Sequence, residues 1–342
     1  MFEDVNKKLT IPKGKAHLVK EICKNFKYYH KAFAKIDAAA MACQTSGKEL
    51  LTSSRLFLEN IDFDLAYFPL KHLGYKCITV ATSDLLAMNG TPKAIALTLA
   101  ISNRFSVEAI EELMTGVRIF CDTHRTNLQS FDITTSVHGL IISVTTFGEV
   151  ESERRLTHAG AQENDLLCVT GDLASAYAGL LLLEREKKVF EADPSTQPDL
   201  EEHRYILERQ LKPEPRLDVI NALRESKIVP TSMALVANGL AAAALHLCEA
   251  SHTGCDIFEN KLPIDSLTFL QLKEWKIVGT TIALNGGEDY ELLFTINQKD
   301  YEAIKKMEEV TVIGYIKEAA AGCNLITNDQ KALPLRAQEF EN

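Results

Sequence analysis

The 342-residue chain is long enough for two domains of ordinary size, and its 46% of hydrophobic residues can supply each with a core. A net charge of −10 opposes non-specific binding to nucleic acid, because phosphates are repelled, but it leaves room for a phosphorylated small ligand. No apolar run approaches the roughly 18 residues of a membrane helix, and residues 1–4 lack the basic start of a signal peptide. We therefore expect a cytoplasmic protein that binds neither nucleic acid nor a membrane.

Sequence patterns in the N-terminal half predict a mixture of strands and helices. Helix 106–120 is the clearest, because Ser106 can cap it and apolar residues recur every three or four positions. The charged residues 149–155 indicate a linker, or alternatively an exposed hairpin end, so we divide the chain into domains 1–150 and 151–342. The predicted strands are 50–58, 94–101 and 139–147, and the predicted helices are 15–26, 69–88 and 106–120.

The C-terminal half has the same mixed character. A short strand, 165–170, runs through Gly171 and Asp172 into an apolar helix, 173–183, and a polar loop follows at 191–200. Neither half shows the strict alternation of a doubly wound sheet, so we predict an α/β protein of the α+β kind. The other predicted elements are helices 201–211, 215–224, 237–250 and 299–308 and strands 290–296, 310–316 and 323–326.

The cysteines of the chain do not form a metal-binding pattern in sequence. None of them makes a C-x-x-C pair, and most lie in apolar segments. We therefore predict buried, reduced thiols and no zinc site. The eight are Cys23, Cys43, Cys77, Cys121, Cys168, Cys248, Cys255 and Cys323.

Standard nucleotide signatures are missing, since the sequence has no Walker A loop, kinase-type glycine loop or dinucleotide fingerprint. Several short segments nevertheless stand out. Residues 285–291 (Asn-Gly-Gly-Glu-Asp-Tyr-Glu) place two glycines and three acids before a strand, which suits close backbone approach to a ligand but also describes a charged loop. The Gly171–Asp172 corner offers a helix N-terminus to a phosphate, or is simply a helix cap.

Two single aspartates also suggest chemistry. Asp84 lies inside an otherwise apolar helix, where an unpaired charge is costly, so it indicates a metal ligand or an exposed turn. Asp132 precedes two threonines and a serine, a pattern that suits magnesium or phosphate and also fits a loop with local hydrogen bonds.

Taken in order, these segments resemble the thiamine-monophosphate kinase family, which is related to aminoimidazole ribonucleotide synthetase. The Gly-Gly-Glu-Asp-Tyr-Glu-Leu and Ser-Asp-Leu-x-Ala-Met-Asn-Gly blocks are the most specific, and the resemblance runs from about residue 36 to residue 340. The segments that carry it are 68–76, 83–92, 132–148, 169–180, 212–216 and 284–294.

The resemblance implies a two-domain synthetase-like fold. An N-terminal mixed sheet would form a barrel across a homodimer, and ATP with several Mg²⁺ ions would lie between that sheet and a C-terminal α/β domain. The implied reaction converts ATP and thiamine monophosphate to ADP and thiamine diphosphate. Metal ions would neutralise the phosphates during direct transfer, with little covalent chemistry by the protein.

The sequence departs from the family pattern mainly at expected metal ligands. Gly-Asp-Asp-Ala-Ala reads Ile-Asp-Ala-Ala-Ala at 36–40, and the Ser-Thr-Asp step ends in Arg55. Gly-x-His-Phe reads Asn-Ile-Asp-Phe at 60–63, and Gly-Gly-Asp-Thr-Thr reads Ser-Phe-Asp-Ile-Thr at 130–134. The Asp-x-Ser-Asp-Gly-Leu block reads Leu-Val-Ala-Asn-Gly-Leu at 235–240, and the aspartate after it is Ala243.

Position-by-position transfer of the family's functional residues leaves a reduced site in which no catalytic residue can be named. Residues 212–216 match a motif that we interpret as structural. The transferred metal ligands are Asp84 and Asp132 with the weak ligands Ser53 and Ser54; the ATP-binding residues are Phe131, Asp132 and His158; the substrate-binding residues are Asp62, Glu288 and Phe340.

These losses lead to three hypotheses. Removing one electrostatic stabiliser lowers a rate by roughly 10² to 10³, and Arg55 would place a cation beside Mg²⁺. The first hypothesis is a thiamine-monophosphate kinase with weakened activity, ATP as co-substrate and fewer or weaker Mg²⁺ sites. The second is a non-catalytic homologue, or pseudoenzyme, that keeps the homodimer and part of the nucleotide cleft. The third is a related ATP-dependent enzyme with another substrate.

Overall fold

The computed structural model describes residues 39–42, 47–198 and 200–340. The predicted helix at 15–26 and residues 36–38 of the altered first signature lie outside the described residues, as do Cys23 and Cys43.

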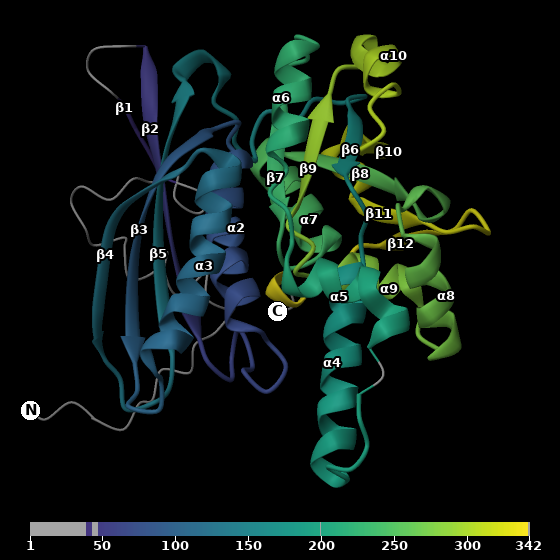
Figure 1. The fold of residues 1–342 in the computed structure, drawn as a ribbon. Helices are drawn as coiled ribbons and strands as arrows, with labels where there is room; N and C mark the ends of the chain where they lie inside the picture. Colours follow the sequence, from purple (N-terminus) through teal and green to yellow (C-terminus); the bar gives the residue numbers. More distant parts are fainter. Residues whose placement is uncertain (1–38, 43–46, 199, 341–342) are drawn as a thin grey trace, which may run out of the picture.

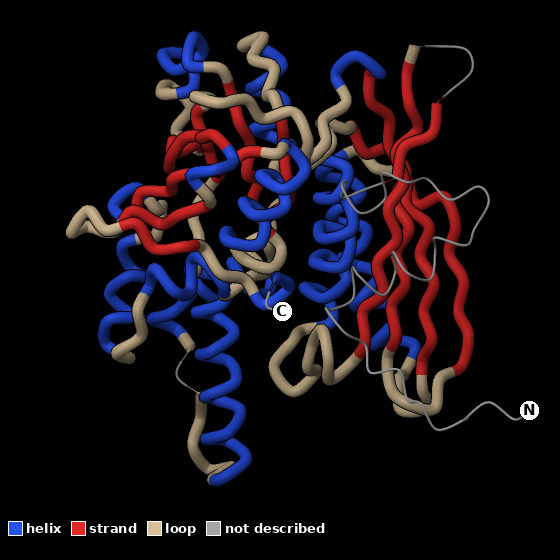
Figure 2. The backbone as a smooth tube through the Cα atoms, turned by 180° about the vertical axis from the view of Figure 1, so that it is seen from behind, coloured by secondary structure: helices blue, strands red, loops and turns tan. Residues whose placement is uncertain are grey.

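The N-terminal half is a five-stranded sheet with helices on one face. Its strand order is β1-β2-β5-β3-β4; β3 and β4 are parallel, and the other neighbours are antiparallel. The strands are β1 (Ala39–Ala42), β2 (Lys48–Leu58), β3 (Thr91–Ile101), β4 (Asn127–Thr135) and β5 (Ile141–Glu151), and the helices are α2 (Leu70–Leu86) and α3 (Val107–His124). Figures 1 and 2 show α2 and α3 between this sheet and the C-terminal half.

The sequence explains how these helices pack. Ser106 caps α3 as predicted, because its side chain accepts a hydrogen bond from the backbone N–H of Ala109. The two helices approach closely at Gly74 and Gly116, where an added Cβ would lie 2.1 Å from the Leu113 carbonyl oxygen and 1.8 Å from the Lys71 carbonyl oxygen, respectively. On the strands, alternate residues such as Val144 and Thr146 of β5 are buried beneath the helices.

The C-terminal half is a seven-stranded sheet of order β12-β11-β8-β10-β6-β9-β7, in which β8 and β11 are parallel and the other neighbours antiparallel. Figure 1 shows α4 extending away from this sheet. The strands are β6 (Leu166–Thr170), β7 (Ser232–Val236), β8 (Thr253–Phe258), β9 (Glu291–Ile296), β10 (Val310–Glu318), β11 (Cys323–Ile326) and β12 (Ala332–Pro334). The helices are α4 (Ser175–Ala192), α5 (Arg204–Leu211), α6 (Leu217–Glu225), α7 (Leu240–Ser251), α8 (Ser266–Glu274), α9 (Gly279–Asn285) and α10 (Tyr301–Ile304).

Short 3-10 turns join several of these elements. They are η2 (Ser152–Arg154), η3 (Glu201–His203), η4 (Glu259–Lys261), η5 (Gln298–Asp300), η6 (Ala319–Ala321) and η7 (Gln338–Phe340). The predicted linker at 149–155 is in part structured, because β5 continues to Glu151 and η2 follows it.

Some sequence predictions differ from the structure. The helix predicted at 299–308 is limited to η5 and α10, and β4, β7, β8, α8 and α9 were not predicted. β4 is exposed along its whole length and is largely polar, so it lacks the alternation that marks a half-buried strand. β7 and β8 are buried runs of five and six residues, a length at which periodicity does not separate strand from helix.

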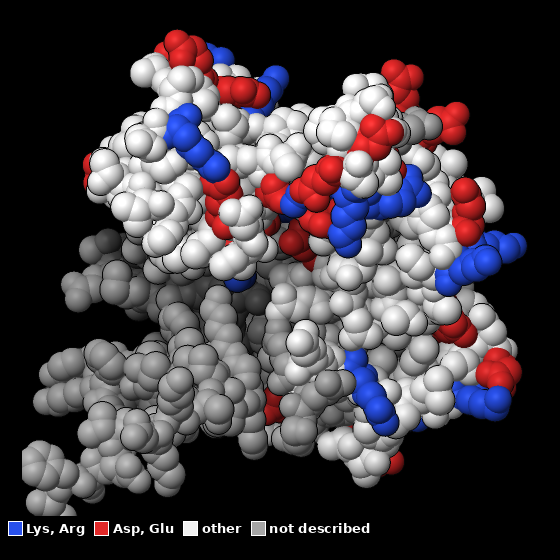
Figure 3. All heavy atoms as spheres, turned by 90° about the horizontal axis from the view of Figure 1, so that it is seen from below, with Lys and Arg blue, Asp and Glu red and all other residues white. Residues whose placement is uncertain are grey.

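The mixed α/β architecture predicted from the sequence is confirmed. Within the described residues, none of the helices has both the length and the apolar character needed to cross a membrane. Seen from below, acidic and basic side chains lie next to one another over the described part of the surface (Figure 3).

Candidate functional site

The carboxylate of Asp84 is the centre of the N-terminal part of the candidate site. It is fully buried on α2 and faces β2. Arg55 binds it through two nitrogens: Nε donates to Oδ2 at 2.7 Å, and Nη2 donates to Oδ1. Ser53 adds a third hydrogen bond, from Oγ to Oδ2 at 2.5 Å. Both carboxylate oxygens are therefore engaged by neighbours on β2.

This arrangement does not fit a magnesium ion at Asp84. Mg²⁺ needs oxygen ligands, whereas the guanidinium of Arg55 offers only donors and carries a positive charge of its own. The paired arginine already supplies the charge that a buried carboxylate requires. The assignment of Asp84 as a metal ligand stays a prediction, and it would require the carboxylate to leave Arg55.

The remaining predicted metal ligands lie on the other face of the N-terminal sheet. Ser54 follows Ser53 along the strand and points the opposite way, and its Oγ lies 2.7 Å from Thr145 Oγ1. Asp132 on β4 pairs with Thr98 of β3, whose neighbours Leu97 and Leu99 are buried under the helices. Asp132 consequently lies on the face away from Asp84, and its Oδ1 accepts from the Ile133 N–H at 2.9 Å.

The predicted metal and ATP residues therefore do not converge within one chain. Ser53 and Asp84 lie on the helix-covered face, whereas Ser54 and Asp132 share the outer face. Phe131 is on the edge strand β4 with 41% of its surface exposed. The third predicted ATP residue, His158, lies in the other half of the molecule.

Apolar packing occupies the block that replaces Asp-x-Ser-Asp-Gly-Leu. Leu235 on β7 and Ala243 on α7 are both buried in hydrophobic cores. Between these two elements, Gly239 has φ 93°, and a Cβ there would lie 2.4 Å from the Leu284 carbonyl oxygen. In this structure, two of the three positions where the family pattern has aspartates carry side chains that stabilise the core.

The loop before β9 carries the predicted substrate residue Glu288. Gly287, Glu288 and Tyr290 all have positive φ angles, of 77°, 63° and 51°. The Glu288 N–H donates to the Ala237 carbonyl at 2.8 Å, and the Tyr290 N–H donates to the Val236 carbonyl at 2.9 Å. These two bonds hold the unusual backbone against the end of β7. Such conformations cluster at functional sites in proteins.

Glu288 also connects the two halves of the molecule. Its Oε2 accepts hydrogen bonds from Lys76 Nζ on α2 at 2.7 Å and from Gln210 Nε2 on α5 at 2.9 Å. Lys76 is buried, and its Nζ also donates to the Gln210 carbonyl at 2.8 Å. Burial raises the pKa of Glu288, but the charge and hydrogen bond of Lys76 outweigh it, so the pKa lies below its usual value.

The pKa of Tyr290 responds to the charges of two predicted substrate residues. Burial raises the pKa of Tyr290 well above its usual value, and the negative charges of Glu288 and Asp62 act in the same direction. The positive charge of Arg55 opposes them. Asp62 is held in the turn after β2, where its Oδ2 accepts from the Leu58 N–H at 2.8 Å. The structure therefore brings Asp62 and Glu288 into one electrostatic neighbourhood.

His158 and Phe340 meet through a residue that sequence analysis missed, His246 on α7. The ring centroids of His158 and His246 are 6.0 Å apart, and those of His246 and Phe340 are 4.8 Å apart. The backbone carbonyl of His158 also accepts from Ser251 Oγ at 3.0 Å. Two residues predicted for opposite ends of the ligand site thus belong to one aromatic cluster.

A second buried carboxylate, Glu291, lies next to this site. Arg216 binds it through Nε and Nη2 at 2.5 and 2.7 Å, Arg209 Nη2 lies at 2.7 Å, and Thr170 Oγ1 donates at 2.5 Å. Arg209 also pairs with Asp172 at 3.0 Å. The segment 212–216, interpreted as structural, therefore supplies a residue that neutralises a buried charge.

Asp289 has a different environment from Glu291. Burial raises the pKa of Asp289 well above its usual value. Its Oδ1 has no hydrogen-bond partner among the described residues, and its Oδ2 accepts only from the Ala174 N–H at 3.4 Å. The positive charge of Arg209 opposes this rise in pKa, whereas the negative charges of Asp172 and Glu291 add to it.

Sequence reasoning missed Lys76, Tyr290, His246 and Arg209. A charged residue within the apolar pattern of α2 drew attention to Asp84, and the same signal could have identified Lys76, eight residues earlier. Arg209 and His246 lie on helices whose patterns carry no such signal, and only the tertiary fold brings them to the site.

Comparisons with known proteins agree with this fold. The family model "AIR synthase related protein, N-terminal domain" matches residues 35–150. Thiamine-monophosphate kinase from Buchnera aphidicola subsp. Schizaphis graminum is 32% identical over 290 residues, covering 83% of each chain. The Bacillus subtilis enzyme of that name is 29% identical over 314 residues, covering 90% of this chain and 92% of the relative.

A solved structure described as AaThiL complexed with AMPPCP and TMP superposes with a TM-score of 0.80. It is 26% identical to this chain, and the match covers 94% of both chains. The sequence resemblance, the two-sheet architecture and these relatives point to one family. The chain belongs to the thiamine-monophosphate kinase family.

Proposed function

We propose that the chain binds ATP and thiamine monophosphate in the manner of its family but transfers phosphate only weakly. The observation that carries this proposal is the occupation of both Asp84 oxygens by Arg55 and Ser53. In-line phosphate transfer depends on cations that neutralise the transferring group. An arginine bound on both its Nε and Nη2 to a buried carboxylate has much of its charge already balanced.

Support for retained substrate binding comes from the cluster around Glu288. The thiazolium ring of a thiamine phosphate is cationic, and the carboxylates of Glu288 and Asp62 are the groups that would attract it. Lys76 keeps Glu288 ionised, because its ammonium group lies 2.7 Å from the carboxylate. We assign these residues to the thiamine end and Phe131 to the nucleotide end. The aromatic cluster, which contains both Phe340 and His158, would then lie where the two ends meet.

A homodimer would explain why the predicted ligands fall on both faces of the N-terminal sheet. Among the described residues, no helix covers the face that carries Ser54 and Asp132, and Leu56 on it is 56% exposed. Burial of that face against a second copy would remove apolar surface from water. We therefore propose a dimer through this face, with a boundary near residue 150 between the dimerisation and C-terminal domains. Light scattering on the full chain tests the dimer, and a monomer at micromolar concentration contradicts it.

A non-catalytic homologue is the second candidate. The observation that favours it is the burial of Leu235 and Ala243 in the hydrophobic cores at positions where the family pattern has carboxylates. Apolar side chains in those places stabilise a metal-free fold, because unmetallated carboxylates would repel one another there. The third candidate is an enzyme for another substrate. The family's substrate-binding step is changed at Asn60, Ile61 and Asp62, so the test also covers this candidate.

The test is formation of thiamine diphosphate from ATP and thiamine monophosphate at saturating Mg²⁺, side by side with the Bacillus subtilis relative. We expect a rate lower by at least about 10²-fold, because several electrostatic stabilisers are absent. Turnover within tenfold of the relative contradicts the proposal. Calorimetric titration with thiamine monophosphate separates the candidates, since binding without turnover supports the non-catalytic reading. ATP binding without thiamine monophosphate binding supports another substrate.

The matched variant for that titration is Glu288→Gln, which keeps the side-chain shape and removes the charge. We expect it to weaken thiamine monophosphate binding by about tenfold and to leave ATP binding unchanged. Lys331→Met, just before β12 and in an exposed pair with Asp329, is the control that should alter neither.

A further inference from the structure

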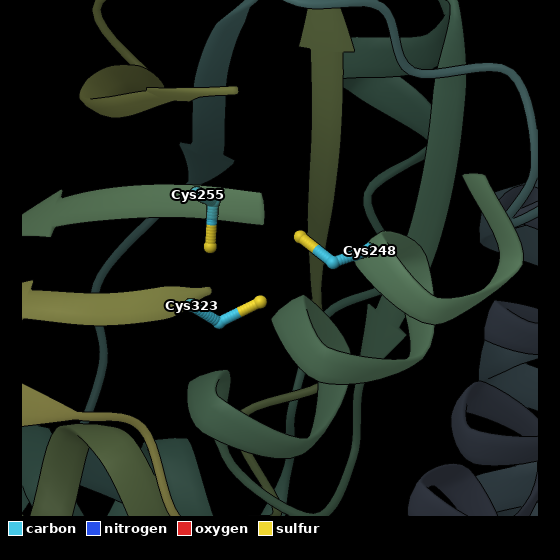
Figure 4. A group of neighbouring side chains, drawn as sticks. All are labelled: Cys248, Cys255 and Cys323. Carbon is cyan, nitrogen blue, oxygen red and sulfur yellow. The ribbon is translucent and has the colours of Figure 1, made fainter. Parts of the chain in front are cut away.

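Three cysteines that are scattered in the sequence meet in the C-terminal half. Cys248 comes from the last turn of α7, Cys255 from β8 and Cys323 from the start of β11. Their sulfur atoms all lie within 4.8 Å of one another. Figure 4 shows the three side chains pointing toward a common centre. The sequence analysis predicted buried, reduced thiols, and no spacing in the sequence indicated this cluster.

Regular secondary structure fixes the positions of these sulfurs. β8 and β11 are parallel neighbours, and Cys255 and Cys323 are direct partners in their register. The Cys255 N–H donates to the Gly322 carbonyl at 3.1 Å, which extends the same ladder. Cys248 is linked to β8 by a turn in which His252 has φ 57°. The cluster is therefore supported by two strands and a helix, with little freedom to separate.

The surroundings of the cluster are apolar, and one side is open. Cys248 and Cys255 are buried, whereas Cys323 is half-buried and gives access from solvent. Among the described residues, no histidine or carboxylate joins the three sulfurs. Asp256 follows Cys255 but points to the other face of β8, where Lys317 and Asn324 bind it at 3.0 and 3.2 Å. The potential ligands are therefore sulfur alone.

The geometry suits a shared ion better than a disulfide. Partners in adjacent parallel strands have Cα–Cβ bonds that run side by side at about 4.8 Å spacing, whereas a disulfide needs its two Cβ atoms at about 3.8 Å. A disulfide would also join only two of the three cysteines and give the third no bonding partner. Three thiolates around one metal, with metal–sulfur bonds of about 2.3 Å, place the sulfurs about 4 Å apart. That spacing is within the observed limit of 4.8 Å.

We propose that Cys248, Cys255 and Cys323 form a binding site for one soft, thiophilic metal ion, and that Cu(I) is the ion it fits. Thiolate ligands select soft ions such as Cu(I), whereas structural zinc sites almost always have four ligands and this cluster offers three. Binding involves no change of oxidation state. Each thiol that binds loses its proton to the buffer, and the sulfur donates an electron pair to Cu(I).

The experiment is an anaerobic titration of the reduced, full-length protein with Cu(I) in the presence of a chromophoric Cu(I) chelator. We expect one equivalent of Cu(I) to resist the chelator. Cys323→Ser should weaken this binding by at least about tenfold, and its half-buried position makes it the variant least harmful to folding. Circular dichroism without metal confirms that the variant folds.

Matched controls test three of the five cysteines outside the cluster; the other two, Cys77 and Cys168, are buried. Cys121→Ser removes a cysteine of similar burial on α3, outside the cluster, and should leave Cu(I) binding unchanged. The double variant Cys23→Ser, Cys43→Ser should behave in the same way. Loss of binding in the double variant, or retention of full binding in Cys323→Ser, overturns the proposal.

X-ray absorption on the Cu(I)-loaded wild-type chain gives a readout that does not depend on a variant. Three sulfur neighbours at about 2.3 Å support the site. Two sulfurs, or nitrogen and oxygen neighbours, contradict it. Tighter binding of Zn(II) than of Cu(I) at the same three cysteines overturns the choice of metal.

Discussion

Asp84 and Glu291 are two carboxylates with fully buried side chains, and each is bound by arginine. They differ in whether that arginine lies in a segment that matches the family pattern or replaces a residue of the pattern. Glu291 is held by Arg209 and Arg216, and Arg216 belongs to a segment that matches the family pattern. Asp84 is held by Arg55, which stands where the family pattern has an aspartate. A buried carboxylate therefore needs a cation beside it, whether that cation is a metal ion or a side chain.

The two arginine sites also differ in their access to water. Arg209 and Arg216 have 11% and 13% of their side chains exposed, whereas Arg55 has 36% exposed. Removing the carboxylate at Glu291 therefore takes a partner from two enclosed arginines, of which Arg209 keeps Asp172. Removing the carboxylate at Asp84 affects one arginine that is already partly in contact with water. We therefore expect substitution of Glu291 to lower the free energy of unfolding more than substitution of Asp84.

Glu291→Gln should have the largest effect, a loss of about 3 to 5 kcal/mol in the free energy of unfolding. The substitution keeps the shape of the side chain but removes the buried carboxylate that Arg216 binds and leaves Arg209 with Asp172 alone. Urea-induced unfolding measures it. The control is Glu149→Gln, which breaks the exposed pairs with Lys48 and Lys93 and should cost at most about 1 kcal/mol. Equal losses for the two variants would contradict the role assigned to Glu291.

Arg55→Met should cost about 2 to 3 kcal/mol, because the buried carboxylate of Asp84 then loses the arginine that binds both of its oxygens. Asp84→Asn should cost less, about 1 kcal/mol, since water can reach the side of Arg55 that remains exposed. The same unfolding experiment ranks the two variants. If Asp84→Asn proves the more harmful, Arg55 is not the group that compensates Asp84.

Arg55→Asp should make the stability of the chain depend on magnesium. Replacing the arginine restores the family's residue beside Asp84 and removes the internal cation. With a dissociation constant of about 1 mM, 10 mM Mg²⁺ would add about 1.4 kcal/mol. Thermal unfolding with and without Mg²⁺ tests this, using the wild-type chain as the matched control. A wild-type shift as large as that of the variant would show that Arg55 does not displace the ion.

Glu214 is a partly exposed carboxylate, and its interactions should stabilise the fold less than those of Asp84 or Glu291. Burial raises its pKa, but hydrogen bonds from His124, Lys212 and Tyr75 outweigh this and lower the pKa to about 2. The resulting stability is present above the unfolded pKa near 4.5 and is lost as the pH falls toward 2. Because 46% of the side chain is exposed, we expect only about 1 kcal/mol. Glu214→Gln should lose it, so the difference from wild type in unfolding free energy should shrink between pH 5 and pH 2.

The sequence was most informative where a single residue breaks a local pattern. Asp84 inside an apolar helix indicated a metal ligand or an exposed turn, and the structure shows a buried carboxylate bound by Arg55. Ser106 indicated the start of α3. Arg55 was recognised as a cation among expected metal ligands. The outcome at Asp84 still required the structure, because Arg55 and Asp84 are brought together only by the packing of α2 on β2.

Other features depend on long-range register and have no local signal. Cys255 and Cys323 become neighbours through the parallel pairing of β8 and β11. His246 meets His158 and Phe340 because η7 returns to α7 near the end of the chain. Short buried strands such as β7 were missed because a five-residue apolar run fits either a strand or a helix.

The central claim is that the Arg55 guanidinium takes the place of a divalent metal at Asp84. Crystals of the full chain grown with Mn²⁺ and ATP, measured at a wavelength where manganese scatters anomalously, test it directly. We predict no anomalous peak beside Asp84, with Arg55 still bound to both carboxylate oxygens. A manganese ion coordinated by Asp84 with Arg55 displaced would contradict the account.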